Sequence, residues 1–466
     1  MKNTVIFLFI LFSIHTQAQK EAWHWYFGNN VGIDFSSGIP VLTNGSLSTY
    51  EGSATISDSS GSLLFYTDGR VVYNRGGLLM PNGYGLLGDS SSTQSSLIVP
   101  LPGSSSIYYI FTVDFNQNGL SNGNGFQYSI VDMSLNNGYG DVTTKNVLIR
   151  LPVYEKLTAI KHSNNSDYWI LINDWQSDAI YAYLLSPSGL NLSPVISPIG
   201  PFHMGNYSNT GGYFKASKQG NKIALALWAK NSFDICDFNN ATGIASNHIT
   251  VQSNDMINTY GIEFSPNGKY LYGTNMEPPC HIYQFDLTSG TPVGILNTRV
   301  TLDSSNTLYH YDALQSAPDG KIYCAHKDEY YLGVIQNPDS AGTQCNYTDS
   351  GFSTGTHLSM LGLPNFPSVG RTVTTGISDL ADEKTITLQP NPAHNELTIH
   401  STTLHENELV SVFVWNVLGE IVFFEKFKWT GDKTIRIDEL PRGMYSLGLK
   451  SNASYSNYAN SIFIKR

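Results

Sequence analysis

Two short runs of polar residues have spacings that could do chemistry, and the first resembles the opening of a calcium-binding loop. Asp114, Asn116 and Asn118 alternate along the chain and are followed by Gly119. In such a loop, alternate side-chain oxygens wrap a hard cation and the glycine permits a sharp turn. The twelfth position is Gly125 and not a glutamate that would bind through both carboxylate oxygens. The pattern therefore predicts weak calcium binding at most, with a hairpin loop rich in glycine and asparagine as the alternative.

The second run places an acid, a cation and an imidazole close together in the chain, at Glu155, Lys161 and His162. If these side chains faced one cavity with perturbed pKa values, Glu155 and His162 could act as general acid and base. The alternative is a structural ion pair beside a hydrogen-bonded histidine. The segment 309–312, in which His310 stands between two tyrosines, is a similar polar and aromatic set, and its alternative is cross-strand packing.

Other signatures of catalysis give an enzyme little support. Neither the H-E-x-x-H motif of zinc proteases nor the G-x-x-x-x-G-K loop that cradles phosphates occurs. The Ser-x-Asp-x-Gly frame of sialidases is also missing, because Asp58 stands three residues before Gly61. We therefore expect no catalytic residues beyond the two candidates Glu155 and His162.

A turn followed by an aromatic strand recurs along the chain. The elements that position the candidate residues are therefore expected to be short strands. Residues 265–272 and 317–323 have nearly the same sequence, and less similar copies begin at Ser60 and Gln219. Proline presets the turn, Asn-Gly or Asp-Gly tolerates positive φ, and apolar residues then enter a strand. A repeat of about 45 to 60 residues that holds several strands predicts the blades of an all-β propeller around a channel. Six units are visible, and residues 23–50 could complete a seventh.

Composition agrees with an all-β chain and narrows the class of partner. The 466 residues include 42 glycines, and 12% are aromatic but only 14% are charged, as expected for many short strands joined by tight turns. The formal net charge of −11 argues against nucleic acid, which is bound by clustered lysine and arginine.

Five stretches between residues 23 and 369 resemble the propeller region of large secreted proteins of gliding bacteria. The stretches are Trp25–Gly28, Glu51–Asp58, Leu64–Gly69, Glu155–Ala159 and Gly362–Phe366. The resemblance implies a fold and no chemistry, because that family has no agreed catalytic residues to carry over.

The last eighty or so residues read as a second all-β module, a small immunoglobulin-like sandwich. Four short motifs follow one another along this module, and their order resembles that of the type A carboxy-terminal sorting domain of the type IX secretion system. The motif positions are Pro390, Asn391, Pro392, Gly419, Gly443, Tyr445 and the basic Lys465. The resemblance implies handling by the type IX machinery and passage through the periplasm and outer membrane to the cell surface or beyond.

The remaining sequence agrees with export. Lys2 followed by an apolar run and small residues before Gln19 predicts a signal peptide at 1–18, and no other stretch is long enough for a transmembrane helix. We expect a propeller at 19–370, a linker at 371–383 and the sorting domain at 384–466. The four cysteines allow several disulfide pairings or none, and the sequence does not choose among them; they are Cys236, Cys280, Cys324 and Cys345.

Two functions from different classes remain open. The first is a non-catalytic propeller that binds a polymer or protein partner at or outside the cell surface. The second is an enzyme that acts on an extracellular glycan or ester through carboxylates in the channel, with no cofactor other than calcium. A channel filled by apolar side chains would favour the binding protein, and convergent carboxylates beside a histidine would favour the enzyme.

Overall fold

The computed structural model describes residues 20–115, 123–175, 177–203, 210–368, 386–401, 406–416, 421–451 and 458–466. The chain divides into two compact units, residues 1–373 and 374–466. The predicted signal peptide and the predicted linker at 371–383 lie outside the described residues. Among the helices that are described, none has both the length and the apolar character needed to cross a membrane.

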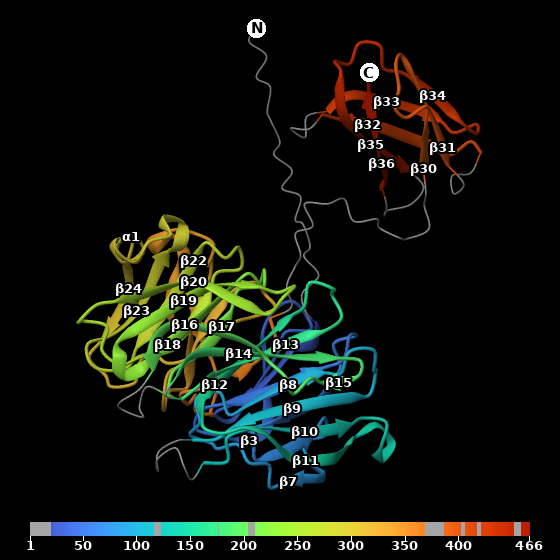
Figure 1. The fold of residues 1–466 in the computed structure, drawn as a ribbon. Coiled ribbons are helices and arrows are strands. Elements are labelled where there is room, and N and C mark those ends of the chain that lie inside the picture. The colour runs from blue at the N-terminus through green and yellow to red at the C-terminus, as the bar shows by residue number, and fades with distance from the viewer. Residues whose placement is uncertain are drawn as a thin grey trace. The chain divides into compact units, whose positions relative to one another are not determined.

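The first unit is a β-propeller, and its described residues form seven sheets, antiparallel except for one parallel pair, whose strands largely follow chain order (Figure 1). The first three sheets contain β1 His24–Phe27, β2 Asn29–Asp34 and β3 Val41–Ser48; then β4 Ser53–Ser57, β5 Leu63–Thr67, β6 Val71–Asn74 and β7 Leu79–Tyr84; then β8 Ser96–Pro100, β9 Ile107–Val113, β10 Phe126–Asp132 and β11 Asp141–Arg150.

The next two sheets contain β12 Val153–Lys161, β13 Tyr168–Asp174, β14 Ser177–Ser186, β15 Gly189–Leu190 and β16 Val195–His203; then β17 Phe214–Ala216, β18 Lys222–Leu227, β19 Ser232–Asn239 and β20 Ile244–Gln252. The last two contain β21 Thr259–Phe264, β22 Tyr270–Asn275, β23 Cys280–Asp286 and β24 Val300–Ser305; then β25 Leu314–Ser316, β26 Ile322–Cys324, β27 Tyr331–Ile335 and β28 Tyr347–Ser353. One α-helix, α1 Pro292–Asn297, precedes β24.

The repeated sequence motif at residues 265–272 and 317–323 forms the same hairpin in two sheets, as the sequence predicts. Each copy joins the first strand of a sheet to the second, β21 to β22 and β25 to β26. Gly268 and Gly320 donate their N–H groups back to the residue that opens the turn. Their φ angles are 73° and 82°, a left-handed conformation that favours glycine. Residues 270–272 and 322–323 therefore occupy corresponding second strands.

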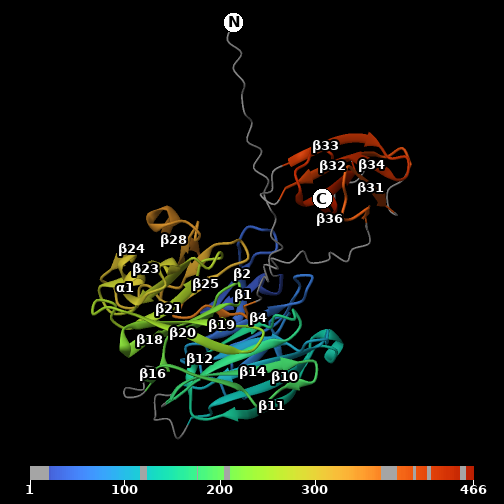
Figure 2. The same ribbon diagram turned by 45° about the horizontal axis from the view of Figure 1, so that its top comes forward.

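The first strands of successive sheets lie side by side around a centre, because β4 contacts β8, β8 contacts β12, and β12 contacts β17. Figure 2 labels β4 and β12 among these strands. Apolar residues of neighbouring sheets pack between them. One such cluster includes Leu97, Phe111, Ile170 and Ile172, each fully buried. Each buried side chain of this size contributes roughly 1.5 to 3 kcal/mol, so the inter-sheet layers hold the ring together.

Residues 358–368, which we name the axial segment, fill the centre of the ring. Its last strand, β29 Pro364–Asn365, pairs in parallel with β4, and Leu361 accepts a hydrogen bond from the N–H of Ala313 just before β25. Ser368 donates its N–H to Ala159 of β12 over 2.7 Å and its hydroxyl to the carbonyl of Ser217 over 2.7 Å. The axial segment thus ties several sheets to one another.

Two residues show how tightly the axial segment is held. A Cβ on Gly362 would lie 2.0 Å from the backbone oxygen of Glu51, so only glycine fits at this position. Asn365 donates to the backbone oxygens of Ser96 and Leu157 and accepts from Gln94. Its amide therefore satisfies buried carbonyl groups of two sheets, which an apolar side chain could not do.

The four cysteines at positions 236, 280, 324 and 345 are free and buried, so no disulfide contributes to the described structure. Residues 280, 324 and 345 belong to one cluster with Tyr272 and Leu314 between neighbouring sheets. Buried in this way, they act as small apolar residues.

The second unit is a sandwich of two antiparallel sheets. The first contains β30 Ile386–Gln389, β31 Glu396–Ser401 and β34 Lys433–Arg436, and the second contains β32 Leu409–Trp415, β33 Ile421–Lys428, β35 Gly443–Ser451 and β36 Tyr458–Lys465. Alternate residues of β32, namely Val410, Val412 and Val414, point into a core that also holds Ile399 and Leu447. The predicted fold class, a propeller followed by a β-sandwich, is confirmed.

Candidate functional site

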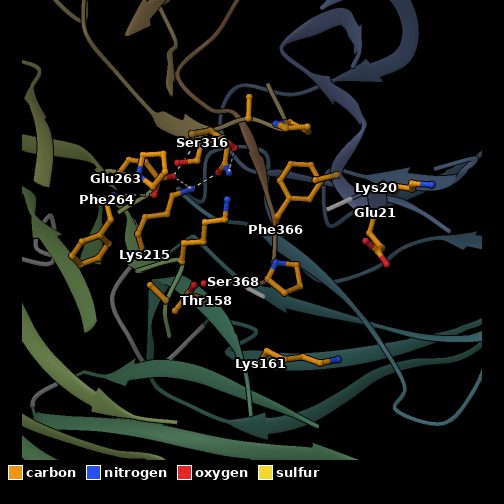
Figure 3. A pocket seen from close by; sticks show the side chains of 18 of the residues that line it. Lys20, Glu21, Thr158, Lys161, Lys215, Glu263, Phe264, Ser316, Phe366 and Ser368 are labelled. Atoms are coloured by element: carbon orange, nitrogen blue, oxygen red, sulfur yellow. Dashed lines mark hydrogen bonds and ion pairs between the residues drawn. The ribbon is translucent and has the colours of Figure 1, made fainter. Parts of the chain in front are cut away.

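A pocket of about 670 Å³ opens at the end of the propeller where the first strands run into their turns. Its wall includes turn residues such as Pro266, Pro318 and Asp319, and the axial segment contributes Phe366 and Ser368 (Figure 3). The axial segment therefore forms part of the pocket wall. We call this cavity the channel-mouth pocket. Its volume lies within the range of small-molecule sites, roughly 300 to 1,000 Å³.

A charged pair and an amide lie together in the pocket wall. The Lys215 ammonium contacts Glu263 at 3.6 Å and makes a short hydrogen bond to the side-chain oxygen of Gln315. The Glu263 carboxylate also accepts the backbone N–H groups of Phe264 and Ser316, each over 3.0 Å (Figure 3). The side chains of Lys215 and Glu263 are both only 7% exposed. We call Lys215, Glu263 and Gln315 the wall triad.

Burial acts on the two charged members of the wall triad in opposite directions. It lowers the pKa of Lys215 and raises the pKa of Glu263, because each charge is removed from water. Their mutual attraction and the two backbone N–H groups oppose this effect. The wall triad therefore presents fixed donors and acceptors at the edge of the pocket.

Aromatic and cationic side chains complete the lining. Lys161 places its ammonium 3.9 Å above the centre of the Tyr168 ring, and burial lowers the pKa of this lysine. The ring of Phe366 faces the same space (Figure 3), whereas Phe264 is only 2% exposed and packs in the core of the propeller. In total, four lysines and three carboxylates line the pocket alongside these rings, so it combines polar groups of both signs with apolar faces.

Motif reasoning missed the wall triad, although the repeat contains the signal that finds it. Lys215, Glu263 and Gln315 each stand two residues before the residue that opens the turn of their sheet. Alternate residues of a strand share a face, so equivalent positions on neighbouring first strands meet around the channel. Aligning the three turns is enough to bring the three polar residues together.

A second group of polar residues is buried deeper in the propeller. Glu51 accepts a 2.8 Å hydrogen bond from the hydroxyl of Tyr260, and Asp312 accepts the backbone N–H of Lys327. Burial raises the pKa values of both carboxyl groups well above normal, and the charge of Glu155 adds to the effect on Glu51. These carboxyls therefore remain protonated at pH values where exposed ones are charged.

We expect Glu51→Gln to change how stability depends on pH. The folded protein holds a proton on Glu51 that the unfolded chain releases above the ordinary glutamate pKa of 4.5, so this group costs the wild type stability as pH rises. Glutamine does not titrate and still accepts from Tyr260. The free energy of unfolding of the variant should differ from that of the wild type by less than about 1 kcal/mol near pH 5. Towards about pH 8.5 the variant should become more stable than the wild type. Urea unfolding at both pH values checks this, and a difference independent of pH would contradict it.

The two predicted acid-base candidates lie at opposite ends of one strand. Glu155 is buried near the start of β12, where it accepts a hydrogen bond from Thr210. His162 follows the last residue of β12, packs against the ring of Trp169 in a tilted arrangement and accepts the N–H of Asn164 on Nδ1. Seven residues of strand separate them by roughly 23 Å, so they would have to act separately.

The calcium-loop candidates Asn116 and Asn118 lie outside the described residues, and the predicted site stays a prediction. Asp114 is described, and its carboxylate accepts the backbone N–H groups of Phe115 and Asn124 over 2.8 and 2.7 Å. These bonds occupy both oxygens of the one carboxylate that the predicted calcium loop contains.

The G-x-S-x-G pattern of a hydrolase nucleophile occurs twice, at residues 119–123 and 351–355. The first copy lies mostly outside the described residues. In the second copy, Ser353 ends β28 and accepts the N–H of Gly355, and no helix follows within the described residues of the propeller. A nucleophile elbow requires a strand-to-helix turn, so the second copy lacks that context.

In the second unit, sorting-motif residues distant in sequence come together. Lys465 of β36 pairs with Gly443 of β35, and Ala393 bridges to Lys465 in parallel. The side chain of Asn391 accepts the N–H of Ile464 over 3.0 Å. Tyr445 donates to the carbonyl of Pro441 and stacks on Phe463. Pro390 and Pro392 belong to the same turn as Asn391, and Gly419 lies outside the described residues.

Comparisons with solved structures find distant likenesses. A proposed 6-phosphogluconolactonase from Bacteroides uniformis is 14% identical, with a TM-score of 0.36 over 64% of this chain and 92% of its own. A protein of unknown function from Desulfotomaculum acetoxidans is 12% identical, with a TM-score of 0.39 over 74% and 99%. An engineered GH43 glycoside hydrolase is 9% identical, with a TM-score of 0.33 over 79% and 90%. These likenesses carry no argument about function.

No curated protein matches the chain. A family model does match its end, over residues 387–465, and describes a secretion system C-terminal sorting domain. This range contains all four sorting motifs, and the described residues of the motifs at Asn391, Tyr445 and Lys465 belong to one sandwich. Residues 387–465 are therefore a C-terminal sorting domain of the type IX secretion system, and the chain is a protein exported to the cell surface or the extracellular space.

Proposed function

We propose that this exported propeller is a binding protein that takes a short saccharide segment of an extracellular glycan into the channel-mouth pocket. The observation that carries the proposal is the combination of the wall triad with the rings of Tyr168 and Phe366 around one pocket of about 670 Å³. The sorting domain agrees with this proposal, because it directs the chain to the cell surface or the extracellular space, where glycans are exposed.

The chemistry of a sugar matches both kinds of lining. Each hydroxyl group of a sugar donates and accepts hydrogen bonds, and the wall triad offers ammonium, carboxylate and amide groups in fixed positions. The C–H face of a sugar ring is apolar and packs on an aromatic ring, which Tyr168 and Phe366 present at the pocket. A purely anionic ligand would suit the pocket less well, because carboxylates stand among the lysines.

The state of the carboxyl groups favours binding over hydrolysis. Glycosidases use a pair of carboxyls, one of which must be free to exchange protons with the substrate. Here Glu263 accepts two backbone N–H groups, and Asp319 accepts the hydroxyl of Tyr323 over 2.9 Å and the N–H of Lys321. These two carboxyls are engaged in holding the wall of the pocket.

A glycan array probed with the purified mature chain tests the proposal. The side chain of Lys161 lines the pocket, so Lys161→Ala should weaken binding to the saccharides that the wild type recognises by about tenfold, or about 1.4 kcal/mol. The matched control is Lys145→Ala, which removes a similar lysine placed 4.8 Å above the Tyr84 ring but outside the pocket. Equal loss in both variants, or binding only to peptides or proteins, would contradict the proposal.

One observation favours the alternative of an enzyme acting on a glycan or ester. Glu51 and Asp312 are buried carboxyls with raised pKa values, a property that catalytic acids share. A panel of glycan and ester substrates incubated with wild type and Glu51→Gln separates the two functions. Turnover by wild type that Glu51→Gln abolishes without loss of folding would favour the enzyme over the binding protein.

A further inference from the structure

Two histidines and an aspartate converge in the last sheet of the propeller, away from the channel-mouth pocket. His310 precedes β25, His326 follows β26 and Asp349 lies on β28. One ligand atom from each residue lies within 4.8 Å of the other two. The His310 Nε2 atom is 3.3 Å from the Asp349 carboxylate, and the His326 Nε2 atom is 3.7 Å from it.

These separations suit a bound transition metal. In a tetrahedral zinc site with metal–ligand bonds of roughly 2.0–2.1 Å, neighbouring ligand atoms lie about 3.3 Å apart. Two imidazole nitrogens and one carboxylate oxygen form a donor set used by zinc and similar divalent metals, whereas calcium and magnesium prefer oxygen alone. Small movements of the three side chains would therefore complete three sides of such a site.

The surroundings of His326 prepare its Nε2 atom for a metal. The ring is fully buried, and its Nδ1 atom makes a short hydrogen bond with the backbone oxygen of His310. Since a carbonyl only accepts, Nδ1 is the protonated nitrogen and Nε2 keeps its lone pair on the side of Asp349.

Neighbouring residues orient the carboxylate and leave room beside it. The Tyr347 hydroxyl donates to Asp349 over 3.1 Å and lies 3.4 Å from the His326 Nε2 atom. On the adjacent strand β27, a Cβ on Gly333 would lie 2.3 Å from the Tyr347 hydroxyl and 2.8 Å from the His326 Nε2 atom. Glycine therefore keeps open a space that any other residue would fill.

We propose that His310, His326 and Asp349 bind one divalent transition metal ion of the zinc class. Asp349 is about one-third exposed, which leaves a side from which the ion and a fourth ligand, such as water, can enter. The three ligands come from three segments of one sheet, β25 to β28, so the bound ion would join its first, second and last strands. This proposal is independent of the saccharide proposal, because none of these residues lines the channel-mouth pocket.

The test uses the mature chain stripped of metal with a chelator and then titrated with zinc chloride by calorimetry. We expect one zinc ion per chain and a rise in melting temperature, since the ion binds the folded state alone. Cobalt chloride should produce the visible absorption of cobalt in a low-symmetry nitrogen and oxygen site. Calcium chloride should produce neither heat nor a melting shift at this site.

Three variants decide whether the ion occupies these residues. His310→Gln and Asp349→Asn should each weaken zinc binding by more than the roughly 10- to 100-fold that loss of a supporting residue costs, while the metal-free melting temperature stays close to wild type. His248→Gln is the matched control, because His248 also pairs with an aspartate, Asp234, at 3.3 Å but has no second imidazole beside it among the described residues. Absence of stoichiometric zinc uptake, or uptake that His310→Gln and Asp349→Asn leave unchanged, would overturn the proposal.

Discussion

Replacing Lys215 with methionine is expected to destabilise the propeller by about 3 to 5 kcal/mol, because it leaves the buried Glu263 carboxylate without its cation. Both side chains are almost fully buried, so water cannot substitute for the lost partner. Protonation of Glu263, whose pKa burial already raises, limits the loss. Urea unfolding near neutral pH measures the effect.

The double variant Lys215→Met with Glu263→Gln should recover much of this loss, since no charge then remains buried. Lys222→Met is the matched control, because Lys222 forms a similar ion pair with Asp237 at the surface. Loss of an exposed pair of this kind costs about 0 to 1 kcal/mol. If Lys215→Met and Lys222→Met proved equally mild, the wall triad would not be the rigid element that we describe.

Deleting residues 384–466 is expected to abolish export while leaving the propeller folded. The two units each have their own core, so removal of the sandwich does not expose the inter-sheet layers of the propeller. Without the sorting domain, the chain should cross the inner membrane and accumulate in the periplasm of a host that has a type IX system. Cell fractionation with circular dichroism of the recovered protein measures both location and folding.

The reciprocal experiment transfers residues 371–466 to a reporter that is normally periplasmic, and the reporter should then appear at the cell surface or in the medium. Secretion of the truncated chain at the wild-type level would show that residues 384–466 are not the export signal. A truncated chain that is degraded in the periplasm would contradict the statement that the propeller folds by itself.

The parts of the fold that arise from local chemistry were open to prediction from sequence. The turns at 265–268 and 317–320 combine proline with Asn-Gly or Asp-Gly, and in both copies this local pattern forms the hairpin that joins the first two strands of a sheet. The strands of the sorting domain likewise follow from alternation, as in Val410, Val412 and Val414. Such features depend on residues a few positions apart.

The axial segment and the sites depend on contacts between residues far apart in sequence, and no local pattern predicts those. Asn365 contacts Gln94 across 271 residues, and its role is invisible until the ring closes. The pair Glu155 and His162 shows the reverse case. Residues that are close in sequence but separated by an extended strand move apart by about 3.3 Å per residue.

His310 illustrates the same limit at the proposed metal site. Its position between two tyrosines marks it in the sequence as part of a polar and aromatic set. Its partners His326 and Asp349 stand 16 and 39 residues later, and these separations match no known metal-binding motif. Only the antiparallel pairing of β25 to β28 brings the three together. A repeat alignment that reveals equivalent strands would have been needed to find them.

A crystal structure of the mature chain with a saccharide identified on the glycan array tests the central claim most directly. The account predicts the sugar in the channel-mouth pocket, with hydroxyl groups bonded to the wall triad and a ring face against Tyr168 or Phe366. A saccharide bound on the outer strands of the sheets, or beside Glu51 and Asp312, with the channel-mouth pocket empty, would contradict it.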